Sequence, residues 1–225
     1  MLVGLDVVRC PTCFRRLSVG AACPTHSTVV AIEAETLDEP APRVAGYSEL
    51  QLLGTGGFSR VWQARDSKGT AVALKISIAP NDQRFDREAD AMRRLGAELC
   101  PALIGQGITS DGRCLIAMEL LQGQLLSDWL ASSAQQIPPL AESTAILLKL
   151  CAQVDRMHQA GVLHRDLKPE NTMLMEDGSI RLLDLGLARY LEADADNAEV
   201  DEIALTQTGS MLGTVTYIAP EQSLG

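Results

Sequence analysis

The sequence lacks a surplus of positive charge, because its 19 Lys and Arg face 29 Asp and Glu, which gives a formal net charge of −10 at pH 7. A chain this acidic is a poor candidate for a protein that mainly binds nucleic-acid phosphates. No apolar run approaches the roughly 20 residues that a membrane-spanning helix needs, so we expect no membrane segment within this chain. The apolar start, residues 1–8, lacks the basic residues of a secretory signal, so we expect a cytoplasmic protein.

The remaining composition is that of a folded protein. The chain has 225 residues, enough for one large domain or two small ones. Hydrophobic residues make up 46% and charged residues 21%, both close to globular averages, which excludes wholesale disorder. Composition divides the chain into a Cys-rich segment over 1–26, an acidic, Pro-containing linker over 27–46, and a long region over 47–225.

Strand and helix patterns alternate along this long region. Short runs of β-branched or alternating apolar residues predict strands over 47–53, 60–64, 71–78, 103–107 and 113–119. Apolar residues at helical spacing predict two helices, over 81–95 and 140–160. The second helix has an apolar stripe formed by Ile146, Leu147, Leu150, Val154 and Met157. The order of these elements indicates an α+β domain with its sheet first and its helices later.

Three of the six cysteines lie close together near the start of the chain. With one histidine they form two short turns of the type Cys-Pro-Thr-Cys/His, whose candidate ligands are Cys10, Cys13, Cys23 and His26. Two such turns have the form of two metal knuckles, each offering two ligands to a tetrahedral Zn²⁺. This zinc would be structural, since four protein ligands leave no open position, and the segment could dock a partner. The alternatives are a reactive dithiol at Cys10 and Cys13, or no metal.

A Gly-rich turn, LGTGGFSRVW, lies between the first two predicted strands, over 53–62. Its backbone N–H groups could approach phosphate oxygens without interference from Cβ atoms, although such turns also occur in ordinary hairpins. Lys75 follows the apolar residues of the run VALK in the third predicted strand and would direct its charge beneath the turn. The alternative for Lys75 alone is a surface lysine at a strand end.

The segment HRDLKPEN, residues 164–171, places an acid, a base and an amide in one irregular loop. Asp166 could accept a hydroxyl proton, Lys168 could contact a transferring phosphoryl group, and Asn171 could offer an oxygen to a divalent metal. Asp184 follows a short apolar strand and is a second hard oxygen ligand suited to Mg²⁺. The run GTVTYIAPE, residues 213–221, stands near the end.

Taken in order, these five elements resemble the signature of the eukaryotic-type Ser/Thr protein kinases: a Gly-rich loop, a strand lysine, HRD, DFG and APE. The resemblance covers residues 47–225. It implies a two-lobe fold, with a β-rich N-lobe over 47–121 and a partial, helical C-lobe over 122–225. It also implies ATP- and Mg²⁺-dependent transfer of the γ-phosphoryl group to Ser or Thr hydroxyls of a protein substrate.

The resemblance implies a role for each nucleotide-binding residue. The turn that would cover the ATP phosphates comprises Leu53, Gly54, Thr55, Gly56, Gly57, Phe58, Ser59, Arg60 and Val61. Lys75 would contact the α- and β-phosphates and pair with Glu88 of the following helix. Glu119 and Leu121 would give backbone hydrogen bonds to adenine.

It also implies roles for the residues that act on the γ-phosphoryl group. Asp166 resembles the catalytic base, and Lys168 the residue that contacts the γ-phosphate. Asn171 and Asp184 resemble the Mg²⁺ ligands. The position of Lys168, two residues after the base, resembles Ser/Thr rather than Tyr kinases.

The sequence departs from the family pattern at three points. Ser59 replaces the third glycine of the loop, and Leu185 replaces the phenylalanine of DFG, but neither change removes a required charge. The sequence ends four residues after Glu221, where the family continues with further helices. We therefore expect little transfer from this chain as given. The alternative function is a catalytically weak ATP-binding scaffold or a module that docks a partner.

Overall fold

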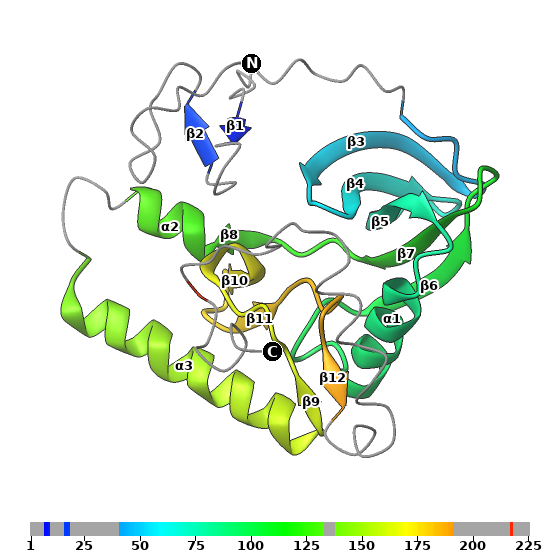
Figure 1. Ribbon diagram of the computed structural model, residues 1–225. Helices are drawn as coiled ribbons and strands as arrows, with labels where there is room; N and C mark the ends of the chain where they lie inside the picture. Colours follow the sequence, from blue (N-terminus) through cyan, green and yellow to red (C-terminus); the bar gives the residue numbers. More distant parts are fainter. Residues whose placement is uncertain (1–6, 10–15, 19–40, 133–137, 191–216, 218–225) are drawn as a thin grey trace.

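The computed structural model describes residues 7–9, 16–18, 41–132, 138–190 and 217. Its N-terminal lobe is a five-stranded antiparallel sheet with the strand order β3-β4-β5-β7-β6 (Figure 1). The strands are β3 (Tyr47–Thr55), β4 (Ser59–Asp66), β5 (Ala71–Pro80), β6 (Leu103–Ile108) and β7 (Arg113–Glu119). All five predicted strands are confirmed, and each observed strand matches or extends its predicted bounds.

The central strand β5 is covered on both faces. Val72, Leu74 and Ile76 are buried in an apolar cluster with Trp62. Because side chains alternate along a strand, Lys75 points to the opposite face. Lys75 lies inside this strand, as the predicted bounds 71–78 require, because β5 continues to residue 80. Lys75 is also buried, so the alternative of a surface lysine at a strand end is wrong.

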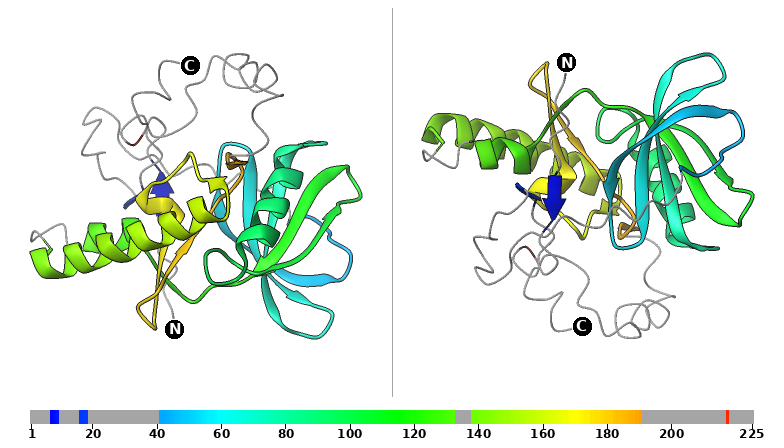
Figure 2. Two further views of the ribbon diagram at one scale, coloured as in Figure 1. Left: turned by 90° about the horizontal axis from the view of Figure 1, so that it is seen from below. Right: turned by 90° about the horizontal axis from the view of Figure 1, so that it is seen from above.

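The helix α1 (Arg84–Leu95) lies against β6 and β7 (Figure 2). It covers the face that Lys75 occupies, because Lys75 contacts Glu88 of this helix. Phe85, Ala89 and Met92 are buried at the spacing that predicted this helix. The helix begins three residues later than expected, because Asn81 has a left-handed backbone with φ of 55°. The buried face of α1 belongs to a core cluster that includes residues of both lobes, so the helix packs against each of them.

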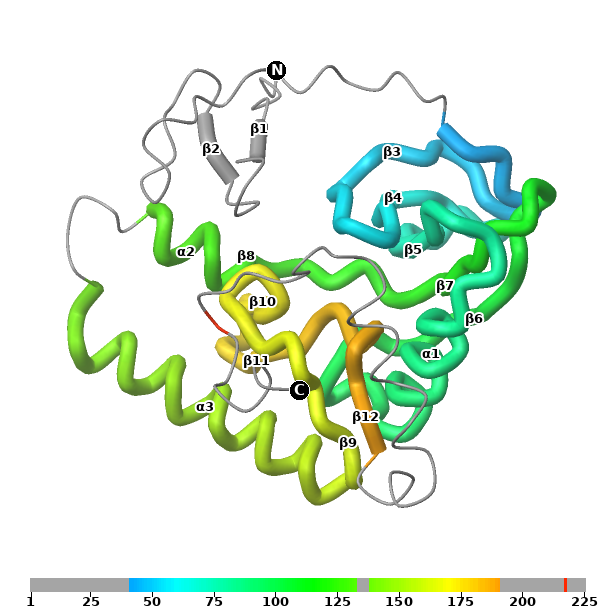
Figure 3. Tube along the Cα trace, viewed as in Figure 1, coloured from blue at the N-terminus to red at the C-terminus, as the bar shows by residue number. Residues whose placement is uncertain are grey.

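The C-terminal lobe combines helices with short strands. The helices are α2 (Leu126–Ser132), α3 (Leu140–Gln159) and the 3₁₀ turn η1 (Pro169–Asn171). The strands are β8 (Gly123–Leu125), β9 (Val162–Leu163), β10 (Thr172–Met175), β11 (Ile180–Leu182) and β12 (Arg189–Tyr190). They form a three-stranded sheet in the order β11-β10-β8 and a separate pair, β12-β9. The long helix α3 runs along the edge of this lobe and confirms the second predicted helix (Figure 3).

One residue of the predicted stripe of α3 is placed wrongly. Met157 is buried, and Ile146, Leu150 and Val154 pack against the core that it joins. Leu147 is instead 59% exposed. Successive helical residues differ by about 100° around the axis, so Leu147 lies to one side of a face defined by its neighbour Ile146.

Two further findings concern the start of the chain. The short strands β1 (Val7–Arg9) and β2 (Arg16–Ser18) pair in an antiparallel hairpin. Val44 is buried in the cluster that contains Trp62, so residues before Tyr47 also pack on the N-terminal lobe. The candidate zinc ligands Cys10, Cys13, Cys23 and His26, and the segment 213–216 with Glu221, lie outside the described residues. Among the helices that the structure describes, none is both long and apolar enough to cross a bilayer.

Candidate active site

A lysine and two carboxylates from three different elements meet on the face of the sheet that α1 covers. Nζ of Lys75 lies 2.7 and 2.6 Å from the two carboxylate oxygens of Glu88, and 2.7 Å from Oδ1 of Asp184. The Lys75 and Glu88 side chains are buried, with 7% and 4% exposed, whereas the Asp184 side chain is 49% exposed. The pair between Lys75 and Glu88 that the sequence implies is therefore present, and Lys75 holds a second carboxylate at the same time.

Burial and charge act together on these three groups. Burial opposes the charge of Lys75, but the carboxylates of Asp184 and Glu88 outweigh it and raise the pKa of the lysine. Burial raises the pKa of Glu88, and Lys75 opposes this effect only in part. The charge of Lys75 lowers the pKa of Asp184 to about 2. At neutral pH the site thus presents an ammonium group and a half-exposed carboxylate, which suit a phosphate and a metal ion respectively.

The Gly-rich turn joins β3 to β4, and cross-strand pairing places it beside Lys75. Gly54 pairs with Val61 of β4, and Val61 pairs with Lys75 of β5. A hydrogen bond of 2.8 Å from the Gly56 N–H to the Ser59 carbonyl closes the turn. A Cβ added at Gly54 would meet no atom within 4 Å, so the backbone there is open to a ligand.

The rest of the hairpin is tied to β5 and α1. The Ile78 N–H donates to the Phe58 carbonyl at 2.8 Å. The guanidinium of Arg84 lies over the Phe58 ring, 3.4 Å from its centroid. The same hairpin contains the other residues of the turn predicted to cover the phosphates, which are Leu53, Thr55, Gly57 and Arg60.

The segment between the lobes begins at the end of β7. The Glu119 N–H donates to the Ala102 carbonyl at 2.9 Å, and the Glu119 carboxylate accepts the Ala102 N–H at 3.2 Å. Leu121 follows two residues later, before β8. The crossing chain is therefore fixed to the N-terminal lobe where the adenine contacts are expected.

Two side chains of the loop that contains η1 converge on the carboxylate of a third, Asp166. Nζ of Lys168 donates to Oδ2 of Asp166 at 2.6 Å. Nδ2 of Asn171 donates to the same oxygen and to the Asp166 carbonyl, both at 2.9 Å. The loop predicted from HRDLKPEN is therefore a single hydrogen-bonded unit centred on Asp166.

A histidine joins this loop to Asp184, and sequence reasoning did not foresee its role. Nε2 of His164 lies 3.0 Å from the Leu183 carbonyl, and its Nδ1 accepts the Asp166 N–H at 3.3 Å. The Leu183 N–H also donates to the Asn171 carbonyl at 2.8 Å. Leu183 is thus held from both sides, which places Asp184, the next residue, beside the loop.

The state of His164 agrees with these contacts. The residue is 4% exposed, and its burial lowers the pKa of the imidazole, although the nearby carboxylates act in the opposite direction. A neutral ring can accept at Nδ1 while Nε2–H donates to Leu183, which is the pattern observed. The one sequence feature that could have indicated a role for His164 is its position as the first residue of HRDLKPEN.

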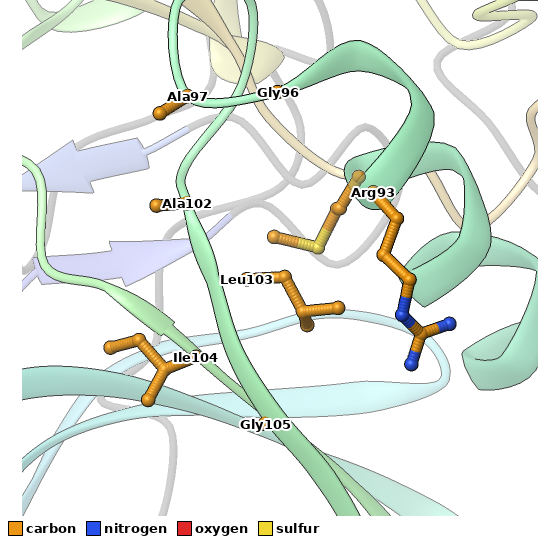
Figure 4. Close-up of a pocket in the computed structure, with 8 residues that line it drawn as sticks. Arg93, Gly96, Ala97, Ala102, Leu103, Ile104 and Gly105 are labelled. Atoms are coloured by element: carbon orange, nitrogen blue, oxygen red, sulfur yellow. The ribbon is translucent and has the colours of Figure 1, made fainter.

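A hollow of about 480 Å³ lies elsewhere, between the end of α1 and the start of β6 (Figure 4). Met92, Arg93 and Leu103 line it, and none of the predicted site residues does. In the part of the chain that the structure describes, no group of three or more His, Cys, Asp or Glu converges as in an all-protein metal cage. A Mg²⁺ ion held by one carboxylate, one amide and substrate phosphates does not need such a group.

Comparison with known proteins agrees with this geometry. The family model of the protein kinase domain matches residues 47–223. Two curated bacterial relatives are the "Probable serine/threonine-protein kinase PknB" of Corynebacterium glutamicum and the "Serine/threonine-protein kinase PknL" of Mycobacterium tuberculosis. The first is 34% identical over 184 residues, which cover 77% of this chain and 27% of the relative. The second is 35% identical over 201 residues, which cover 85% of this chain and 47% of the relative.

A third relative, the "Serine/threonine-protein kinase pkn2" of Myxococcus xanthus, is 33% identical over 189 residues, or 80% of this chain and 22% of the relative. The chain thus spans less than half of the length of each of these proteins. The family model, in contrast, covers most of the chain and includes both lobes. The chain belongs to the protein kinase family, and its described part has the protein-kinase-like fold with a β-rich N-terminal lobe.

Proposed function

We propose that this chain transfers the γ-phosphoryl group of ATP, with Mg²⁺, to a Ser or Thr hydroxyl of a protein substrate. The observation that carries the proposal is the double contact of Lys75 with Glu88 and Asp184. It brings a phosphate-binding cation next to a metal-binding carboxylate, and phosphoryl transfer depends on both.

The nucleotide would lie between the hairpin and the segment after β7. Lys75 would bind the α- and β-phosphates while Glu88 keeps its ammonium group in place. The open backbone at Gly54 and the turn to Val61 would cover the phosphates. For adenine we assign the carbonyl of Glu119 and the backbone of Leu121, because the Glu119 N–H already donates to Ala102.

The magnesium ligands would be Asn171 and Asp184. Amide and carboxylate oxygens are ligands that Mg²⁺ accepts, and the hydrogen bond between Leu183 and Asn171 keeps the two side chains in neighbouring positions. When bound, the ion neutralises charge on the phosphate oxygens. A Cβ at Gly186 would contact Asp184 Oδ1 at 3.4 Å, so a bare backbone leaves room beside this carboxylate.

The transfer itself would rest on Asp166 and Lys168. The acceptor hydroxyl oxygen forms a bond to the γ-phosphorus, the bond to the β-phosphate oxygen breaks, and ADP leaves. The hydroxyl proton passes to Asp166. Lys168, whose ammonium group lies 2.6 Å from Asp166, would hold the γ-phosphoryl oxygens beside the acceptor. Catalysis then depends on positioning and charge, with no covalent enzyme intermediate.

The test uses the full chain with Mg²⁺, ATP labelled at the γ-phosphate and a generic basic protein substrate. We expect label, transferred at a low rate, on Ser and Thr and none on Tyr after acid hydrolysis of the product. Nucleotide binding without label transfer would overturn the proposal and favour the scaffold alternative. Label on Tyr alone would overturn the acceptor class.

We also propose a structural Zn²⁺ at Cys10, Cys13, Cys23 and His26. The support is their chemistry and the hairpin of β1 and β2, because the pairing of Arg9 with Arg16 brackets the segment that contains Cys10 and Cys13. Elemental analysis of protein expressed with ample zinc should give one Zn²⁺ per chain, and Cys10→Ser should lower that ratio. A zinc-free wild-type protein would exclude the site.

A further inference from the structure

One aromatic residue, Tyr190, lies where three segments of the chain meet, and no step proposed above uses it. It ends β12 and pairs with Val162 of β9 (Figure 1). Its hydroxyl donates to the carbonyl of Arg87 in α1 at 3.5 Å. Its ring lies 5.4 Å from the guanidinium carbon of Arg94, which follows Arg87 by about two helical turns of α1. Two contacts thus join Tyr190 to the helix that carries Glu88.

The Arg94 side chain also reaches the turn that follows α3. A Cβ added at Gly161 would lie 2.9 Å from Nη2 of Arg94, so the guanidinium group packs against bare backbone there. Gly161 has φ of 73°, a conformation that favours glycine on its own account. Arg94 therefore contacts two neighbouring elements of the C-terminal lobe, β12 through Tyr190 and the turn before β9 through Gly161.

The bond from Tyr190 to Arg87 differs from two other links between the region of α1 and the C-terminal lobe. The Leu182 N–H donates to the Leu99 carbonyl at 2.8 Å, and Arg181 donates to the Glu98 carbonyl at 3.0 Å. Both bonds fix the segment that follows α1, ten and eleven residues after Glu88. Tyr190 instead bonds to Arg87, the residue immediately before Glu88.

We propose that Tyr190 and Arg94 are positioning residues, which hold α1 so that Glu88 stays paired with Lys75. The inference rests on the proposed kinase function, in which that pair orients the phosphate-binding ammonium group. The contacts at the end of α1 act as a pivot, and those of Tyr190 and Arg94 limit rotation of the helix about it. Loss of either side chain then lowers the fraction of molecules in which Lys75 is correctly held.

The first experiment measures amide hydrogen exchange across α1, which does not depend on activity. Arg94→Met removes the cation but keeps an apolar stem, and Arg93→Met is the matched control, because Arg93 bonds to Asp90 and Gln106 within the N-terminal lobe. We expect exchange in α1 to rise about threefold in Arg94→Met, which loses only the cation–π contact. We expect it to rise about tenfold in Tyr190→Ala, which loses that contact and the hydrogen bond to Arg87. Equal exchange in Arg94→Met and Arg93→Met would overturn the proposal.

The second experiment uses transfer rates in a double-mutant cycle with Glu88→Gln. If Arg94 acts through Glu88, adding Arg94→Met to Glu88→Gln should change kcat by less than about twofold, because the carboxylate that Arg94 helps to position is already absent. Tyr190→Phe, which keeps the ring but loses the hydrogen bond to Arg87, should lower kcat less than Tyr190→Ala does. Additive effects of Arg94→Met and Glu88→Gln would overturn the proposal. If the wild-type chain transfers no phosphate, the proposed function fails, and the exchange measurement alone decides on the positioning role.

Discussion

Two groups of charged side chains at the site are built in opposite ways. The first, which we name the buried cluster, consists of Lys75, Glu88 and Asp184, whose contacts span 13 and 109 residues of sequence. The second, which we name the loop cluster, consists of Asp166, Lys168 and Asn171, whose contacts span 2 and 5 residues. The buried cluster needs a strand, a helix and a loop to meet, whereas the loop cluster forms within one turn of chain.

Because the two clusters are assembled differently, mutations in them should have different effects on stability and on catalysis. An ammonium group that loses its partner inside a protein is costly, so the buried cluster is stable only when the sheet, α1 and β11 are all in place. In the loop cluster the Lys168 and Asp166 side chains are 18% and 20% exposed, compared with 7% and 4% for Lys75 and Glu88, so water can replace a lost contact in part. Mutations in the buried cluster should therefore lower both the stability of the fold and the rate of transfer. Mutations in the loop cluster should lower the rate of transfer alone.

The largest effect is expected where the two clusters meet. Asp184→Asn removes the proposed metal ligand and one partner of Lys75, so transfer should fall by at least about 10³-fold, as when an electrostatic group at the reacting centre is removed. Nucleotide binding should weaken as well. Asp177→Asn, an exposed acid in the turn after β10, is the control. Transfer of labelled phosphate near the wild-type rate in Asp184→Asn would contradict the assignment.

A change in the loop cluster should separate chemistry from fold. Asp166→Asn removes the proposed base and should lower kcat by about 10²–10⁴-fold, the usual contribution of general base catalysis. The KM for ATP and the melting temperature should stay close to the wild-type values, because the nucleotide contacts belong to other elements. Steady-state kinetics and thermal unfolding of the same preparation test both expectations. A large fall in Tm would show that the two clusters are not independent.

A change in the buried cluster should instead appear as instability. Glu88→Gln should lower the free energy of unfolding by about 3 kcal/mol, the low end for a broken buried pair, since Asp184 still contacts Lys75. The matched control is Glu49→Gln, which breaks a pair with Arg65 in which the side chains are 69% and 49% exposed. That change should cost less than about 1 kcal/mol. Equal losses in urea unfolding would remove the distinction between buried and exposed pairs.

Sequence patterns were sufficient for those elements whose signal is local. The strands of the N-terminal lobe, α1 and α3 each extend over enough residues to show their period. The pairing of Lys75 with Glu88 could be predicted because the kinase motifs of the sequence stand in a recognisable order. The loop cluster could be named for the same reason, since its members lie within six residues.

The remaining features depend on contacts that no local pattern contains. The helix α2 is only seven residues long, and β9 and β12 have two residues each, too short for a period to appear. Leu147 and Leu148 follow Ile146 directly, so the sequence could not tell which of them faces the core. His164 and Tyr190 bond to residues 19 and 103 positions away, and those distances reflect the tertiary fold alone.

The smallest expected effect concerns the residue that connects the two clusters. Burial lowers the pKa of His164 below its usual value of 6.5. Above pH 6.5 the ring is neutral in the folded and the unfolded chain, and its contribution to stability is complete. As the pH falls below 6.5, the unfolded chain binds a proton that the folded chain excludes, so the folded state loses stability until the folded pKa is reached.

This contribution can be isolated by its slope with pH. One such proton changes the free energy of unfolding by at most about 1.4 kcal/mol per pH unit. His164→Gln keeps a donor for the Leu183 carbonyl but has no charge to gain, so the fall in stability between pH 6.5 and pH 5 should be shallower than in the wild type. His158→Asn, which removes an exposed histidine near the end of α3, is the control. If urea unfolding gives the same slope for wild type and His164→Gln, the acid sensitivity comes from other groups, and His164 joins the loop cluster to Asp184 by its hydrogen bonds without making that junction sensitive to pH.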